Sequence, residues 1–123
     1  MAFPRILIVV PLIVAGAFLP PLGSAPAKAP AGAVGMSHEG FTIKEVRVHR
    51  GNTLTFVNDS RYMHIIGPGR DGTLAEADGQ PMRGRVLMPA NAHYTTPQFT
   101  TPGTYYITCS MHPEMTVKVV VTD

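Results

Sequence analysis

One short segment of the sequence carries residue types that can bind a soft metal. Between Cys109 and Met115 the chain reads CSMHPEM, so a thiol, an imidazole (His112) and a thioether follow one another at steps of three residues. A loop this short can fold all three donors onto one point. Such donors suit copper, because thiolate, imidazole and thioether stabilise Cu(I) without excluding Cu(II). The segment therefore predicts a copper site with Cys109, His112 and Met115 as ligands.

The trigonal plane of such a site needs a second imidazole from elsewhere in the fold. The candidate is His64, which lies in a β-type run 45 positions before Cys109. A β-sandwich can bring two such segments together at one end. The remaining histidines, His38, His49 and His93, lie in polar or turn-like stretches and are predicted to be surface residues. Met36 with His38 nevertheless hints at a second, weak copper site.

Short β-forming runs separated by Gly, Pro and Asn dominate the chain after residue 36. No segment sustains a helical period of 3.6 residues. The pattern predicts an all-β fold, an antiparallel Greek-key β-sandwich. The expected strands are Phe41–Val48, Thr53–Asn58, Tyr62–Ile66, Val86–Met88, Tyr94–Phe99, Thr104–Cys109 and Thr116–Val121.

The alternation of side chains within strands places the key thiol. By the period of two, Tyr105, Ile107 and Cys109 share one face, so Cys109 should end its strand pointing inward. In the last strand, valines should face the core while Lys118 faces water. Residues 67–85 are rich in Gly and charge and are expected to form a long loop, with one helical turn over residues 73–77.

The first residues have the order of a secretory signal peptide. An apolar run from Ile6 to Leu19 follows a weakly positive start, and Ala25-Pro26-Ala27 matches an A-x-A cleavage site. The run is short for a membrane span, which favours cleavage over an uncleaved anchor. We expect residues 1–27 to be a signal peptide, 28–35 a flexible lead-in and 36–123 the folded, exported domain.

Charge and cysteine content narrow the function. Without residues 1–27 the chain loses only Arg5 of its 10 basic residues, which leaves 9 against 8 acidic ones and predicts no nucleic-acid partner. Cys109 is the sole cysteine, although small exported domains usually pair their thiols. Metal ligation explains an unpaired thiol in such a chain.

The combination of these motifs resembles the cupredoxins, the type 1 blue copper proteins, over about Phe41 to Val121. The matching parts are Phe56 to His64, Phe99 to Tyr105, the C-x-x-H-x-x-M loop and Val117 to Val121. The C-x-x-H-x-x-M spacing is similar to the short ligand loop of amicyanin. The resemblance implies one copper per chain, with His64, Cys109 and His112 as equatorial ligands and Met115 as the axial ligand.

The same resemblance implies an electron port at the edge of His112, with Met111 and Pro113 in an apolar patch around it. It also reveals a departure. Many cupredoxins have Asn directly after the upstream His, where the amide ties the two ligand loops together, and this chain has Ile65. Ser110 then lacks its usual partner, which bears on the rigidity of the loop and on the redox potential.

Other uses of Cys109 have weaker support. Zinc would want more Cys or His, a c-type haem would need a second Cys, and a Cys-His nucleophile has no evident orienting residue. We therefore expect no enzyme activity. The leading hypothesis is a monomeric shuttle that carries single electrons between a redox protein donor and a redox protein acceptor. A protein that binds Cu(I) for delivery or resistance and a metal-free interaction module are the alternatives.

Overall fold

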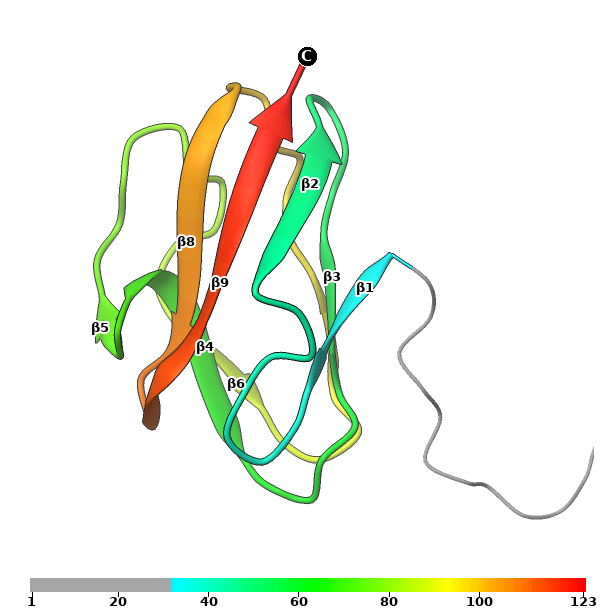
Figure 1. The fold of residues 1–123 in the computed structure, drawn as a ribbon, viewed down its shortest axis with the longest axis vertical. Coiled ribbons are helices and arrows are strands. Elements are labelled where there is room, and N and C mark those ends of the chain that lie inside the picture. The colour runs from blue at the N-terminus through cyan, green and yellow to red at the C-terminus, as the bar shows by residue number, and fades with distance from the viewer. Residues whose placement is uncertain (1–31) are drawn as a thin grey trace, which may run out of the picture.

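The computed structural model describes residues 32–123, which form nine strands and no helix. The strands run roughly along the long axis of the molecule (Figure 1). They are β1 (Ala33–Met36), β2 (Glu45–His49), β3 (Thr55–Asn58), β4 (His64–Arg70), β5 (Thr73–Leu74), β6 (Val86–Met88), β7 (His93–Thr95), β8 (Gly103–Cys109) and β9 (His112–Thr122). Within this range no helix exists that could cross a membrane.

The strands form two sheets, and the all-β prediction is confirmed. One sheet has the order β1-β3-β7, and the other has the order β2-β9-β8-β4-β5 with β6 also paired to β4. Most strand pairs are antiparallel, as predicted, but the sheets are mixed, because β1 pairs with β3 and β2 pairs with β9 in parallel. The parallel pairing of β1 with β3 arises because β2, which lies between them in sequence, belongs to the other sheet. The chain therefore returns to the first sheet in its original direction.

The core lies between the sheets and follows the predicted alternation. Tyr105, Ile107 and Cys109 are all buried on β8, and Val117, Val119 and Val121 are buried on β9. Lys118, between two of these valines, remains 42% exposed. A single apolar cluster joins these residues to Phe56 and Phe99. Cys109 therefore ends its strand inside the core, as predicted.

Two segments differ from the sequence prediction. Residues 67–85 were expected to be a loop with a helical turn, but β4 continues to Arg70 and turns at Asp71-Gly72 into β5. The turn is possible because Gly72 has a φ of +81° and Asp71 a φ of +51°. β1 begins at Ala33, so residues 33–35, expected in a flexible lead-in, belong to a strand. The predicted signal peptide lies outside the described residues.

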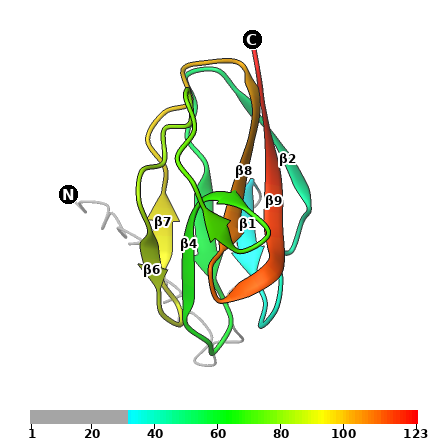
Figure 2. The same ribbon diagram turned by 90° about the vertical axis from the view of Figure 1, so that its left-hand side faces the viewer.

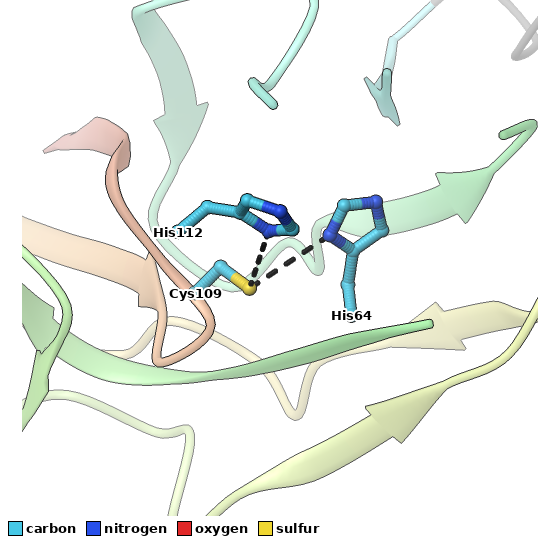
Figure 3. A group of neighbouring side chains, drawn as sticks. All are labelled: His64, Cys109 and His112. Carbon is cyan, nitrogen blue, oxygen red and sulfur yellow. Dashed lines mark hydrogen bonds between the residues drawn. The ribbon is translucent and has the colours of Figure 1, made fainter. Parts of the chain in front are cut away.

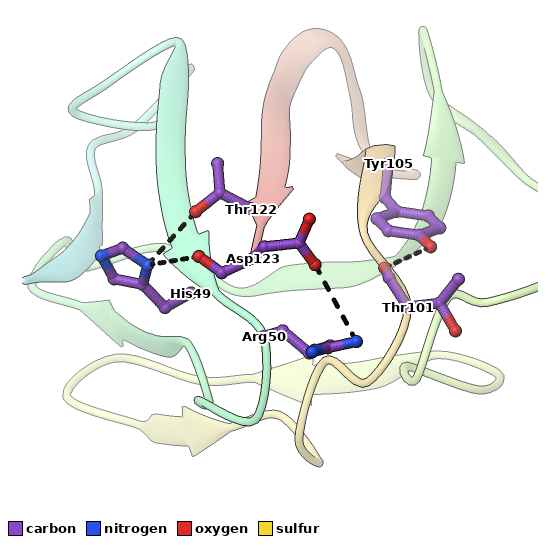
Figure 4. Close-up of polar contacts among 6 residues, drawn as sticks. All are labelled: His49, Arg50, Thr101, Tyr105, Thr122 and Asp123. Atoms are coloured by element: carbon purple, nitrogen blue, oxygen red, sulfur yellow. Dashed lines mark hydrogen bonds and ion pairs between the residues drawn. The ribbon is translucent and has the colours of Figure 1, made fainter.

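Polar contacts close the end of the sandwich at which β2 and β9 finish (Figure 4). The Tyr105 hydroxyl donates a hydrogen bond of 2.7 Å to the Thr101 carbonyl, at the start of β8. His49 Nδ1 lies 3.3 Å from the Thr122 hydroxyl. Arg50 and Asp123 form an exposed ion pair at 3.8 Å, which adds little stability. The β8–β9 hairpin and the β3–β4 connection lie at the opposite end (Figures 1 and 2).

The burial of Ile107 predicts a clear stability effect. Ile107 is fully buried on β8, and its truncation to Ala removes apolar contacts and leaves a cavity. We expect Ile107→Ala to lower the free energy of unfolding by about 2–5 kcal/mol. Lys118→Ala, on the neighbouring strand but facing water, should change it by less than about 0.5 kcal/mol. Urea denaturation of the metal-free protein measures both, and equal effects would contradict this placement of the core.

Candidate metal centre

An irregularity in the β8–β9 hairpin places three of the four predicted ligands around one bulge. Thr108 pairs with Thr116, but the next residue, Cys109, pairs with His112. Between these two pairs, β9 therefore carries three more residues than β8, which form an enlarged bulge. Cys109 lies before this bulge, His112 opens it and Met115 closes it. The short C-x-x-H-x-x-M spacing is thus built as a bulged hairpin.

His64 reaches the same site from a strand that is distant from the β8–β9 hairpin in sequence. It opens β4, where it pairs with Met88 of β6, and two residues later Ile66 pairs with Cys109. His64 and Cys109 are both fully buried, whereas His112 is half-buried. Figure 3 shows both imidazoles turned toward the sulfur of Cys109. The Sγ atom lies 3.8 Å from His64 Nδ1 and 3.9 Å from His112 Nδ1.

These separations fit a metal between the three side chains. Their donor atoms all lie within 4.8 Å of one another, and among the described residues this is the one such group of His, Cys, Asp or Glu. Metal–nitrogen and metal–sulfur bonds of about 2.0–2.3 Å in a trigonal plane would set the donors roughly 3.7 Å apart. One thiolate and two imidazoles form the trigonal donor set of blue copper sites. The donor spacing and chemistry therefore both fit copper.

Met115 is fully buried and belongs to the same apolar cluster as Cys109. Its backbone carbonyl accepts a 3.0 Å hydrogen bond from the Thr108 hydroxyl, across the hairpin from the bulge. This bond fixes the backbone where the bulge closes. The position is compatible with the predicted axial role, in which a thioether binds weakly from outside the trigonal plane.

The turn between β4 and β5 supports the hairpin from its flank. The backbone N–H of Gly72 donates to the Thr108 hydroxyl at 2.9 Å, and that of Asp71 donates to the Thr116 hydroxyl at 3.1 Å. A Cβ on Gly72 would lie only 3.0 Å from the Cα of Pro113. Glycine is therefore needed here both for its positive φ and for the close approach to the bulge.

The two ligand segments are tied together although Ile65 replaces the usual Asn. The backbone N–H of Ser110 donates to the Ile65 carbonyl at 2.9 Å. The Ser110 hydroxyl lies 3.5 Å from the same oxygen, at the limit of a hydrogen bond. Because the main tie is between backbone atoms, it does not depend on the side chain at position 65. Ser110 thus lacks the amide partner, as expected, but it keeps a backbone tie to residue 65.

Three residues near the site have no strong sequence signal. Asn58 and Ser60 lie on the side of His64 that faces away from Cys109, and Ser60 Oγ is 3.3 Å from His64 Nε2. His38 is exposed, as predicted, but its ring stacks on Tyr62 at 3.7 Å between centroids and meets the His112 ring edge-on at 5.8 Å. The signal in the sequence that could have pointed to Asn58 and Ser60 is the polar run Asn58-Asp59-Ser60, which ends four residues before His64.

The surroundings of His64 favour its neutral form. Burial lowers its pKa below the ordinary value of 6.5, and the neighbouring His112 lowers it further. A hydrogen bond from the His64 ring to the Ser37 backbone carbonyl opposes this shift, and His38 adds to the lowering. A neutral imidazole has a free lone pair to offer a metal, so the site favours the form of His64 that can bind.

Comparison with known proteins agrees with the fold and the donor set. Residues 31–122 match the family described as copper binding proteins, plastocyanin/azurin family. The structure of a reduced amicyanin variant is 30% identical over 80% of this chain and 90% of its own, with a TM-score of 0.57. The purple cupredoxin of Nitrosopumilus maritimus, at 19% identity over 79% of this chain and 90% of its own, has a TM-score of 0.53 and shares the fold. Comparison with curated sequences gives no significant match.

This chain therefore belongs to the plastocyanin/azurin family of copper-binding proteins, within the cupredoxin fold. Reduced auracyanin of Roseiflexus castenholzii, 20% identical over 74% of this chain and 95% of its own, shares the fold with a TM-score of 0.54. Copper is the cofactor that matches both the family and the cluster of His64, Cys109 and His112.

The lowered pKa of His64 predicts a pH dependence of stability for the metal-free protein. The unfolded chain binds a proton at His64 near pH 6.5, whereas the folded chain resists it. Stability from this group is therefore complete above pH 6.5 and declines as the pH falls from there toward the lowered folded pKa. Urea denaturation across this range should show a smaller decline in His64→Gln than in the wild type. Equal pH dependence in the two proteins would contradict the prediction.

Proposed function

We propose that this protein is an exported blue copper protein that carries single electrons between redox partners. The observation that carries the proposal is the cluster of one thiol and two imidazoles, of which His64 and Cys109 are fully buried. In the proposal, His64, Cys109 and His112 are the equatorial ligands and Met115 is the axial ligand. The copper supplies reversible exchange between Cu(II) and Cu(I) when it is bound.

The protein contributes fixed geometry and exclusion of water. Cys109 lies at the end of a central strand and His64 at the start of its neighbour, so both donors are held by paired backbone. Their burial keeps water away from the sulfur and from the inner imidazole. Rigid ligands reduce the rearrangement that accompanies a change of oxidation state, which favours rapid electron transfer. Because the thiol of Cys109 is fully buried, the site suits a carrier better than an enzyme.

The half-buried His112 is the proposed electron port. It is the most accessible member of the cluster, and exposed apolar side chains lie beside the ligands in sequence or on a paired strand. These are Tyr62, Met63, Leu87 and Met111. Exposed apolar side chains of this kind suit brief contacts with a redox protein donor and acceptor. The proposal of export rests on the signal-like order of residues 1–27. A single electron port at His112 suits a protein that acts as a monomer.

A second candidate function is copper handling, in which the protein binds Cu(I) for delivery or resistance. Two exposed thioethers favour it, because Met63 is 42% exposed directly before His64 and Met111 is 51% exposed directly before His112. Thioethers are soft donors that select Cu(I). A protein with this function would hold Cu(I) tightly and would remain colourless, because it would not support a stable Cu(II)–thiolate bond.

The thiolate assignment is tested by the visible spectrum. We expect the Cu(II)-loaded protein to show strong thiolate-to-copper absorption and a reversible one-electron couple. Cys109→Ser should abolish this absorption, because a hydroxyl does not replace the thiolate as a donor. His93→Ala, which changes an exposed histidine on β7, should leave the spectrum unchanged. Full colour and metal affinity in Cys109→Ser would refute the ligand set, and a colourless wild type that holds only Cu(I) would favour copper handling.

The axial assignment is tested separately by Met115→Leu. Leucine keeps a similar volume in the buried position but removes the thioether sulfur. Copper should still bind through the three stronger donors, and the reduction potential should rise because an apolar side chain in the axial position makes the surroundings less favourable for the more highly charged Cu(II). Voltammetry of both loaded proteins measures the shift, and Met82→Leu is a matched control at a buried methionine without a predicted ligand role. An unchanged potential would argue against the axial role.

A further inference from the structure

The outer nitrogen of His64 faces a hydroxyl rather than water. Its Nδ1 lies 3.8 Å from Cys109 Sγ, and its Nε2 lies 3.3 Å from the hydroxyl of Ser60. A neutral imidazole has one nitrogen that donates and one that accepts. Only the tautomer with the proton on Nε2 leaves the Nδ1 lone pair free on the side of the sulfur. The group opposite Nε2 therefore decides whether the ring is ready to bind a metal.

The hydrogen-bond pattern around Ser60 leaves its hydroxyl as an acceptor for His64. The single hydroxyl proton goes to the side-chain oxygen of Asn58, at the short distance of 2.6 Å. The hydroxyl oxygen also accepts the backbone N–H of Tyr62 at 3.2 Å. With its proton used by Asn58, the oxygen can offer His64 only a lone pair. The contact is thus satisfied only if His64 Nε2 carries the proton.

The orientation of Asn58 is itself fixed by its surroundings. Asn58 is fully buried, and its amide nitrogen lies 2.7 Å, 2.8 Å and 3.1 Å from the carbonyls of Tyr62, Met88 and Pro89. Because only the NH₂ group can donate to carbonyls, the amide oxygen must point toward Ser60. The backbone N–H of Ser60 also donates to that oxygen, at 3.0 Å. The amide therefore cannot flip without losing several hydrogen bonds.

From this chain of contacts we propose that Ser60 is a positioning residue, which, oriented by Asn58, holds His64 as the Nε2–H tautomer with Nδ1 ready for copper. The relay links β3 and the end of β6 to the first residue of β4. Without the Ser60 acceptor, Cys109 Sγ, 3.8 Å from Nδ1, competes with the Ser37 backbone for the ring proton. A proton drawn to Nδ1 would block the metal-facing lone pair. The consequence for copper rests on the proposed function, but the tautomer itself does not.

The test reads the tautomer of His64 in the metal-free protein. Two-bond ¹H–¹⁵N correlations, recorded above the ordinary histidine pKa of 6.5, distinguish the two ring nitrogens. We expect a single Nε2–H form in the wild type and an admixture of the Nδ1–H form in Ser60→Ala. Ser60→Thr, which keeps the hydroxyl, should restore the Nε2–H form. Affinity for Cu(II), measured by competition with a chelator, should fall about 10-fold in Ser60→Ala and recover in Ser60→Thr.

A matched control variant removes a hydroxyl contact that lies outside the metal site. The hydroxyls of Thr55 and Thr95 lie 2.9 Å apart on an exposed face of β3 and β7, so Thr95→Ala loses a comparable bond. It should change neither the tautomer nor the copper affinity. An unaltered Nε2–H tautomer in Ser60→Ala, or an admixture that persists in Ser60→Thr, would overturn the proposal and leave the Ser37 backbone as the group that orients the ring. A wild type that fails to bind copper would instead refute the proposed function and leave the tautomer result intact.

Discussion

The pairing of β4 with β8 is the constraint on which the metal centre depends. Ile66 lies opposite Cys109 in this pair, and His64 precedes Ile66 by two residues. Because side chains alternate along a strand, His64 and Ile66 point to the same side, toward the core that also receives Cys109. A slip of one residue would turn His64 to the other face of the sheet and separate the two inner donors. The apolar cluster that fixes the register, which includes Ile66, Ile107 and Val117, therefore also fixes the site.

Burying polar donors in this core requires partners for each of them. Asn58, His64 and Thr108 are all fully buried, and each forms hydrogen bonds. Among the described residues no buried side-chain nitrogen or oxygen lacks a partner. An unsatisfied buried polar group typically costs about 1–3 kcal/mol, so a core with several of them would be unstable. The hydrogen bonds that satisfy these groups also orient the ligand side chains, and stability and ligand geometry thus have a common origin.

The sequence predicts the chemistry of the site better than its surroundings. The spacing of Cys109, His112 and Met115 is local, and the strand period places Cys109 in the core, so both features can be read along the chain. The bulge on β9, through which Thr116 and His112 pair with neighbouring residues of β8, has no such local signal. Parallel pairing, the β4–β5 turn and the Ser60 contact likewise depend on segments distant in sequence. Ile65 is instructive, because a side-chain comparison alone suggested a missing tie that the backbone in fact provides.

The donor atoms are already close to metal-bound spacing through contacts between protein atoms alone. The two sulfur–nitrogen separations of 3.8 Å and 3.9 Å differ little from the roughly 3.7 Å expected around a trigonal metal. Each side of the site has its own support: the β4–β5 turn holds the hairpin, and Asn58 with Ser60 holds His64. Since neither support includes the metal, a change in metal charge should leave both in place. A site arranged in this way needs little movement of its ligands when an electron arrives or leaves, which is the physical requirement of an electron carrier.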